Sequence, residues 1–89
     1  MERLAVLFYD YVDDIVERRK PFREEHLGLL HELKDEGVLV MAGALGDPVH
    51  GAAIVFRFAH DAEDFVKRDP YVREGLVTAH RVEPWAIAI

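Results

Sequence analysis

The spacing of apolar positions changes along the first half of the chain, and each spacing predicts a different local structure. Apolar and aromatic residues follow one another at 4–9, which is typical of a buried β-strand. From Pro21 to Glu36 they recur every three or four positions, which predicts an amphipathic helix. Pro21 suits the first turn of this helix, and Gly37 suits the position after its last turn. The charged segment 13–20 is expected to form a helical turn capped by an aspartate.

The second half of the chain predicts a hairpin followed by a short helix. Strands are expected at 38–45 and 52–58, with a loop dense in turn residues between them. We expect Asp61 to cap the next helix, which occupies 62–68, with Asp64 completing a capping-box arrangement.

A proline ends that helix. Pro70 disfavours helical geometry at Asp69, so we expect the chain to break there and to form a further turn from Pro70 to Glu74. Gly75 is expected to end this turn, and the last strand is expected to run from about 77 to 89.

The resulting order is β-α-β-β-α-β, the ferredoxin-like arrangement of α+β proteins, with a four-stranded antiparallel sheet and both helices on one face. We expect a single domain spanning 1–89, because 89 residues suit one small core. Both alternating sets of positions in the strands at 4–9 and 38–45 are apolar, so the second sheet face must also be covered. Sheet-on-sheet packing in a homodimer would cover it, and a hydrophobic content of 51% agrees with a second buried surface.

One titratable residue interrupts the apolar stripe of the main helix. At about 100° per residue, His26 lies on the apolar face, whereas His31 lies on the opposite, charged face. The stripe consists of Phe22, Leu29, Leu30 and Leu33. An imidazole on the core side of a helix needs a polar partner or a pocket, so His26 is the first candidate site residue.

Composition and charge exclude several classes of protein. A net charge of −6 makes nucleic acid and anionic lipid poor partners. No apolar run reaches the ~18–20 residues that a membrane span needs, and the N-terminus lacks a signal-peptide pattern, so we expect a cytoplasmic protein. There is no cysteine, no histidine pair with zinc-ligand spacing and no glycine-rich phosphate loop. We therefore expect neither a metal nor a cofactor.

Three short motifs and their order resemble the YCII-related (YciI-like) family of small stand-alone proteins. They are Arg23-x-x-His26-Leu27, Glu36-Gly37-Val38-Leu39-x-x-Ala42-Gly43 and Asp69-Pro70-Tyr71-x-x-x-Gly75-Leu76, followed by Glu83-Pro84-Trp85. The resemblance covers nearly the whole chain and implies a ferredoxin-like fold that dimerises as an α+β barrel. It also implies a cleft in which the family's histidine and aspartate map onto His26 and Asp69. A dehydrochlorinase-type elimination on a chlorinated hydroxyquinol-like ring has been ascribed to a relative.

His26 and Asp69 together suggest an acid/base dyad. A neutral imidazole can take a proton, and a carboxylate bonded to its other nitrogen fixes the tautomer and stabilises the imidazolium. This predicts a lyase- or isomerase-type enzyme that acts without a cofactor on an unknown small molecule. The alternative is a non-catalytic ligand-binding or assembly module in which the pair is a structural hydrogen bond.

Asp69 and three further residues have both functional and structural interpretations. An aspartate before proline is a standard N-cap, which by itself explains Asp69. Tyr71 could donate its hydroxyl to a substrate or be a core aromatic. Arg23 could bind a substrate carboxylate, although an exposed ion pair is the simpler interpretation. Gly43 could let the backbone approach a ligand, or a strand packed tightly under a helix could require it.

Overall fold

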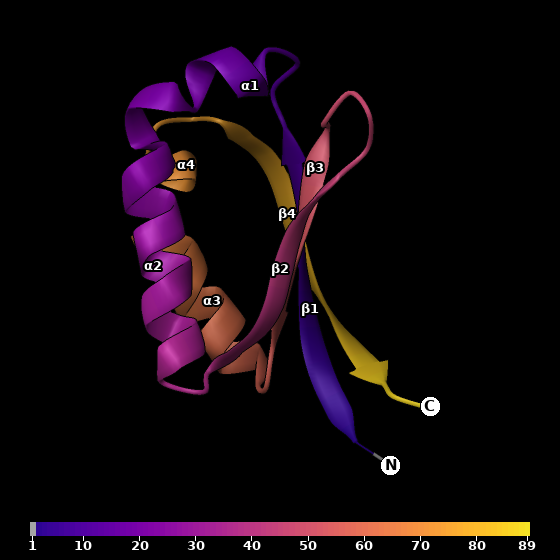
Figure 1. Ribbon diagram of the computed structural model, residues 1–89. Helices are drawn as coiled ribbons and strands as arrows, with labels where there is room; N and C mark the ends of the chain where they lie inside the picture. The colour runs from indigo at the N-terminus through magenta and orange to yellow at the C-terminus, as the bar shows by residue number, and fades with distance from the viewer. Residues whose placement is uncertain (1) are drawn as a thin grey trace.

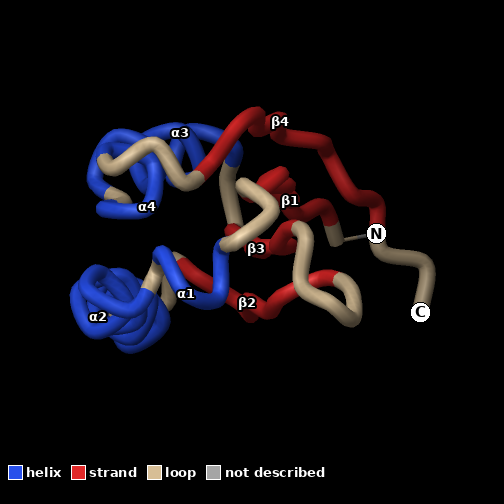
Figure 2. The backbone as a smooth tube through the Cα atoms, turned by 90° about the horizontal axis from the view of Figure 1, so that it is seen from above, coloured by secondary structure: helices blue, strands red, loops and turns tan. Residues whose placement is uncertain are grey.

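The computed structural model describes residues 2–89 as one four-stranded antiparallel sheet with helices packed on one face (Figure 1). The elements in chain order are β1 (Arg3–Tyr11), α1 (Ile15–Arg18), the 3-10 turn η1 (Lys20–Phe22), α2 (Arg23–Asp35), β2 (Leu39–Leu45), β3 (Gly51–Phe56), α3 (Ala59–Arg68), α4 (Pro70–Arg73) and β4 (Val77–Ala86). The sheet order is β2-β3-β1-β4, so β1 and β3 are central and β2 and β4 are edge strands. Seen from above, the helices form one layer and the strands the other (Figure 2).

This arrangement confirms the predicted ferredoxin-like fold. The antiparallel pairing of β1 with both β3 and β4, and of β2 with β3, is the pairing that the β-α-β-β-α-β order requires. The short helices α1 and α4 are the helical turns that the sequence predicts on either side of the main helices. Helix α4 matters most for the site, because it begins directly after Asp69.

Helix α2 forms where the apolar spacing predicts it, although it starts slightly later. The turn η1 takes the first predicted helical residues, and the α-helix begins at Arg23. Gly37 follows the helix with a φ of 78°, the left-handed conformation that favours glycine. His26 and Leu33 are buried, whereas His31 is exposed. The predicted position of His26 on the core side is therefore confirmed.

Two predicted helix caps are wrong. Helix α3 begins at Ala59, before Asp61, because the Phe58 carbonyl already accepts the Asp61 N–H at 3.1 Å. Asp61 thus lies within the first turn, where its charge favours the helix dipole, and no side chain forms a capping hydrogen bond there, so the capping box with Asp64 is absent. Asp14 precedes α1 without a capping hydrogen bond from its side chain.

The ends of the strands follow their neighbours in the sheet. β3 stops at Phe56, which pairs with Ala5 of β1 and with Leu39, the first residue of β2. β4 stops at Ala86, opposite Arg3, the first residue of β1. Both strands are therefore shorter than predicted, because a strand ends where its hydrogen-bonding partner ends.

The main core lies between the sheet and helices α2 and α3. Its buried members are Leu7, Tyr9, Leu33, Leu39, Ala52, Ile54, Phe56, Ala62 and Phe65. A second cluster near α1 and α4 consists of Ile15, Tyr71 and Leu76. Tyr9 adds a hydroxyl group to the main core, and Tyr71 adds one to the second cluster. The candidate site lies where these two clusters meet.

The sheet face away from the helices is apolar and is not covered by any described part of the chain (Figure 1). Met41 and Trp85 are 56% and 46% exposed on this face. With Val6, Phe8 and Val55 they border a hollow of about 560 Å³. We call this surface the open sheet face.

Candidate functional site

Asp69 stands at the junction of three elements and forms the centre of the candidate site. It follows α3 and precedes Pro70, which keeps its backbone extended with φ −72° and ψ 120°. In this position Asp69 is the N-cap of α4, and its Oδ1 atom accepts the backbone N–H of Tyr71 at 3.1 Å. The capping interpretation of Asp69 is therefore confirmed, but capping is only one of its contacts.

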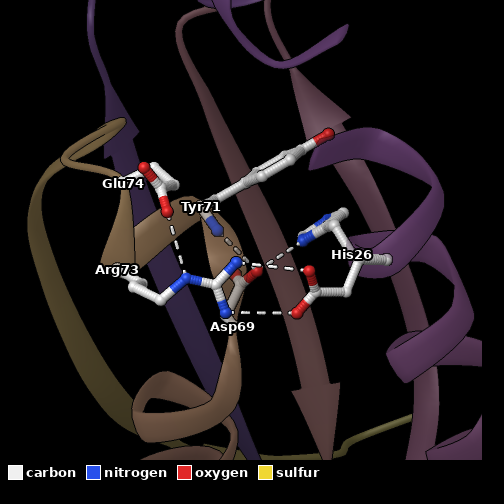
Figure 3. A network of polar contacts seen from close by, with 6 residues as sticks. His26, Asp69, Tyr71, Arg73 and Glu74 are labelled. Atoms are coloured by element: carbon white, nitrogen blue, oxygen red, sulfur yellow. Dashed lines mark hydrogen bonds and ion pairs between the residues drawn. The ribbon is translucent and has the colours of Figure 1, made fainter. Parts of the chain in front are cut away.

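The same carboxylate binds His26 from α2 and Tyr9 from β1. Nδ1 of His26 lies 2.7 Å from Oδ1 of Asp69, and the Tyr9 hydroxyl donates to Oδ2 at 2.9 Å (Figure 3 draws the first contact). His26 and Asp69 are only 6% and 1% exposed. An ionised carboxylate can only accept hydrogen bonds, so Nδ1 carries the proton in this contact. Nε2 of His26 then keeps its lone pair whenever the ring is neutral.

Two aromatic rings hold the imidazole plane. The rings of His26 and Tyr71 are stacked, with centroids 3.7 Å apart and planes at 3°. Phe65 meets His26 edge to face at 6.2 Å. Figure 3 shows the Tyr71 ring lying along the imidazole, with its hydroxyl at the end far from Asp69. The hydrogen bond and the stack together fix the direction in which Nε2 points.

The His26 ring forms part of the wall of a pocket of about 300 Å³ between α2 and the edge strand β2. The polar residues of this pocket are Tyr11, Arg19, Arg23, His26 and Tyr71. The remaining wall consists of small and aliphatic residues from α2, β2, β3 and the hairpin. We call this cavity the histidine pocket. It combines an apolar wall with a few converging polar groups, which is the usual composition of a small-molecule site.

Arg23 and Gly43 also border the histidine pocket, and the structural alternative considered for each is not what the structure shows. Arg23 forms no ion pair with any residue in 2–89, although the sequence favours an exposed pair with a carboxylate. A Cβ atom added at Gly43 would meet no atom within 4 Å, so tight packing does not require glycine there. Both residues thus remain candidate ligand contacts.

Sequence reasoning missed Tyr9, Tyr11 and Arg19. Tyr9 shares its strand parity with the buried Leu7, so the pattern predicts a core aromatic without indicating what its hydroxyl meets. Arg19 lies in a run of charged residues that look alike in the sequence. The one signal that could have found Arg19 is its spacing of one helical turn from Arg23.

Comparison with known proteins identifies the family. A model of the YCII-related domain matches residues 3–86. The chain belongs to the YCII-related family. A relative in Haemophilus influenzae, described only as an uncharacterized protein, is 30% identical over 91 residues, which cover 90% of this chain and 93% of the relative.

Solved structures agree with the fold of this YCII-related protein. The 5-chloro-2-hydroxyhydroquinone dehydrochlorinase of Burkholderia phenoliruptrix, solved with 2,5-dihydroxybenzoquinone, has a TM-score of 0.77 at 21% identity and covers 96% of this chain and 95% of its own. A protein of Agrobacterium tumefaciens has a TM-score of 0.60 at 14% identity, covering 97% of this chain and 93% of its own. At such identities the similarity establishes a shared fold and nothing about the reaction.

Membrane and metal features can be stated for the described part of the YCII-related chain. Within residues 2–89, no helix has both the length and the apolar character that crossing a bilayer requires. The same residues contain no group of three or more histidine and carboxylate side chains placed to hold a metal ion.

An exposed ion-pair network ties α2 to α4 beside the dyad. Arg73 donates from Nη1 and Nη2 to the two carboxylate oxygens of Glu25 at 3.2 Å each, and from Nε to Glu74 at 3.1 Å (Figure 3). Glu25 is the neighbour of His26 on α2, and Arg73 ends the helix that Asp69 caps. Exposed pairs contribute only about 0–1 kcal/mol each, so this network supports the position of α4 without determining it.

The three tyrosines of the chain all lie at the site, and each has a raised pKa. Burial is the main cause for Tyr9 and Tyr11, and the negative charge of Asp69 raises the pKa of both further. Burial also raises the pKa of Tyr71, although the guanidinium groups of Arg23 and Arg19 oppose the shift. The phenols are thus held neutral, which suits them as hydrogen-bond donors.

The two most buried tyrosines allow a matched test of the Asp69 contacts. We expect Tyr9→Phe to lower the free energy of unfolding by about 1–3 kcal/mol, because it removes one donor from a buried carboxylate. Tyr71→Phe removes a buried hydroxyl that has no hydrogen bond of good geometry within residues 2–89 and lies beside the Arg23 guanidinium, so it should cost less stability than Tyr9→Phe. Urea denaturation of both variants measures the difference. Equal losses in the two variants would contradict the assigned role of the Tyr9 hydroxyl.

The raised pKa values also predict how stability depends on alkaline pH. In the unfolded chain each tyrosine should ionise with a pKa of about 10, whereas the folded protein holds all three neutral beyond that pH. Stability is therefore complete below about pH 10 and should fall as the pH rises above it. Phenolate absorbance, recorded together with circular dichroism, should appear only as the protein unfolds. Phenolate absorbance that develops at about pH 10 in the folded state would contradict this prediction.

Proposed function

We propose that this YCII-related protein is a small-molecule enzyme in which His26 acts as general acid and base and Asp69 orients it. The proposal rests on the different surroundings of the two ring nitrogens of His26. Nδ1 is fixed to a buried carboxylate at 2.7 Å, while Nε2 forms no hydrogen bond with residues 2–89 and the ring borders the histidine pocket. A fixed tautomer with a free lone pair is the arrangement that general-base catalysis needs.

The substrate class we propose is a small hydroxylated ring compound, and the reaction class is an elimination. A pocket of about 300 Å³ suits a single six-membered ring, and the structural neighbour named above acts on such a ring. In the proposed step a proton passes from the substrate to Nε2 of His26. The carbon–halogen bond then breaks, and halide leaves with the bonding electrons. The net change is the loss of one hydrogen halide, so the step balances without an oxidant or a reductant.

A second candidate function is a non-catalytic ligand-binding or assembly module. It is favoured by the three hydrogen bonds of Asp69, which connect β1, α2 and α4 and would stabilise the fold whatever the chemistry of the pocket. In that case the His26–Asp69 pair is a structural contact. Removing one partner of a buried ion pair typically costs about 3–5 kcal/mol, so His26→Ala should then be strongly destabilising.

Chloride release from 5-chloro-2-hydroxyhydroquinone under anaerobic conditions tests the enzymatic proposal. We expect His26→Asn to lower kcat/KM by at least about 100-fold, because the amide can still donate to Asp69 but offers no base at the position of Nε2. Asp69→Asn should lower kcat/KM as well, because the imidazole tautomer is no longer fixed. His31→Asn, on the exposed face of the same helix, is the matched control and should turn over at the wild-type rate.

Two results would decide against catalysis by the dyad. Undiminished turnover in both His26→Asn and Asp69→Asn would exclude it directly. A wild-type protein that releases no chloride, together with a loss of several kcal/mol in His26→Ala, would favour the structural alternative. Urea denaturation of each variant separates loss of turnover from loss of folding.

We also propose that the protein is a homodimer that buries the open sheet face. An uncovered apolar patch bordered by Met41 and Trp85 is unusual for a monomer, and sheet-on-sheet packing of two copies would remove it from water. The proposal agrees with the apolar character of both alternating sets of strand positions.

Light scattering at micromolar concentration tests the dimer. The wild-type protein should have twice the chain mass of 10.2 kDa. Met41→Lys should shift it towards the monomer, because the charge would have to be buried against apolar residues. Val16→Lys is the matched control, since Val16 is similarly exposed on α1, away from the open sheet face. A monomeric wild-type protein would overturn the proposal.

A further inference from the structure

Tyr9 contacts the His26–Asp69 dyad from outside the histidine pocket. It is 1% exposed and is not part of the pocket wall, whereas His26, Tyr11 and Tyr71 all border the pocket. Its side chain nevertheless reaches the dyad, because the hydroxyl donates to Oδ2 of Asp69 at 2.9 Å. Any effect of Tyr9 on the chemistry of the pocket must therefore pass through Asp69.

The two carboxylate oxygens of Asp69 have different partners. Oδ1 accepts from Nδ1 of His26 at 2.7 Å and from the backbone N–H of Tyr71 at 3.1 Å. Among residues 2–89, Oδ2 accepts only from the Tyr9 hydroxyl. If the carboxylate turned about its Cβ–Cγ bond, Oδ2 would remain buried without a donor, which is unfavourable. The hydrogen bond from Tyr9 therefore holds Oδ1 in the direction of His26.

Aromatic packing and strand pairing fix the position of the Tyr9 ring. The ring is stacked on Phe65 with centroids 6.4 Å apart and planes at 25°, and it is tilted against Tyr11 at 5.9 Å. Phe65 in turn meets His26 edge to face at 6.2 Å, so one ring lies against both Tyr9 and the imidazole. Because β1 is a central strand, the backbone of Tyr9 is paired on both sides. The donor and the imidazole that it influences are therefore held by the same core.

A donor to Asp69 also affects how readily the dyad takes up a proton. A carboxylate bonded to an imidazole favours the imidazolium form, and a hydrogen bond to that carboxylate weakens this effect. Burial raises the pKa of Tyr9, so the neutral phenol donates to Oδ2 and keeps its proton. Among the other titratable and charged residues around the dyad, no side chain donates to Asp69. These are Tyr11 on β1, Arg19 between α1 and η1, Arg23 on α2, Tyr71 on α4 and the exposed Glu25–Arg73 pair.

We propose that Tyr9 is a positioning residue of the dyad, which aims Asp69 at His26 and sets the pH range in which Nε2 of His26 is free to accept a proton. Tyr9 does not touch the substrate and acts only through Oδ2 of Asp69. In the proposed elimination no bond to Tyr9 forms or breaks, because the substrate proton passes to Nε2 and the hydroxyl keeps its own. This inference rests on the proposed function for the reaction of His26, and it adds the residue that controls when the base is available.

Titration of the histidine rings by NMR of the ¹⁵N-labelled protein tests the role of Tyr9 without a substrate. In Tyr9→Phe the carboxylate of Asp69 loses a donor, so the imidazolium form of His26 should persist to a higher pH. We expect the midpoint of the His26 titration to rise by at least about half a pH unit. His31, exposed on the same helix, is the internal reference and should titrate alike in both proteins.

Leu7→Val is the matched control variant. Leu7 is fully buried on β1 two residues before Tyr9, so it lies on the same face of the strand. Its substitution should cost some stability through lost packing while leaving the hydrogen bonds of Asp69 intact. The His26 titration should therefore be the same as in the wild-type protein.

The pH dependence of chloride release gives a second readout. The acidic limb of kcat/KM reports the base of the free enzyme, so in Tyr9→Phe it should move up by the same amount as the NMR midpoint. At the pH optimum kcat should fall about ten-fold while KM stays within about two-fold, because the substrate contacts remain and only the aim of the imidazole is lost. Leu7→Val should keep the wild-type profile. Urea denaturation establishes that each variant is folded during the assay.

A second variant keeps the test decisive if Tyr9→Phe does not fold. Site-specific Tyr9→3-fluorotyrosine retains the ring and the hydroxyl, and its more acidic phenol is a stronger donor to Asp69. The midpoint of the His26 titration should then fall, which is the opposite of the change expected for Tyr9→Phe.

The outcomes separate this inference from the proposed function. A His26 midpoint that stays unchanged in both Tyr9 variants, or an equal shift in Leu7→Val, would overturn the role of Tyr9. If chloride release depends on His26 while Tyr9→Phe keeps the wild-type kcat and pH profile, the role of Tyr9 is wrong and the enzymatic proposal stands. If the midpoints move as expected while no turnover depends on His26, control of the dyad by Tyr9 stands and the enzymatic proposal fails.

Discussion

The buried carboxylate of Asp69 is the constraint on which the rest of the site depends. Burying a carboxylate costs several kcal/mol unless hydrogen bonds replace its water. Asp69 receives them from three elements: the Tyr9 hydroxyl on β1, the His26 ring on α2 and the Tyr71 backbone on α4. Each donor is fixed by a different part of the fold, so the carboxylate can be satisfied only when the sheet, α2 and α4 are all in place. Folding and assembly of the site are therefore the same event.

This coupling explains why a structural pair and a catalytic dyad need not exclude one another here. The Nδ1 contact of His26 stabilises the fold, and by doing so it fixes the tautomer that leaves Nε2 available. The stack against Tyr71 serves packing and also fixes the ring plane. What distinguishes a functional site is the part of the pocket that packing does not explain. The Tyr71 hydroxyl is such a part, because it is buried without a hydrogen bond of good geometry within residues 2–89 and packing alone gains nothing from it.

The sequence predicts the fold and the positions of His26 and Asp69, but it does not predict all of their contacts. The reasons are physical. The spacing of 3.6 residues places His26 on the apolar face, and an aspartate before proline indicates the N-cap at Asp69, because both signals are local. Whether the two meet depends on how the helices pack on the sheet: the predicted fold puts both helices on one face and makes the meeting plausible, and the family resemblance implies the pair itself. The partner of the Tyr9 hydroxyl could not be predicted, because strand parity specifies burial and not contacts. The predicted cap at Asp61 fails for a related reason: the helix begins where a backbone carbonyl first finds its donor, two residues before the side chain that looks like a cap.

The edge strand β2 connects the histidine pocket with the open sheet face. Its small residues Ala42, Gly43 and Ala44 border both cavities, so at this point only the β2 strand separates the two cavities. Gly43 pairs with Ala53, which borders the open sheet face, and as a glycine it contributes only backbone to the histidine pocket. An edge strand has only one neighbour to hold it, so its position responds to whatever packs on either side. If a second copy covers the open sheet face as proposed, dimerisation fixes the wall of the pocket, and by linkage a ligand in the pocket must favour the dimer to the same extent.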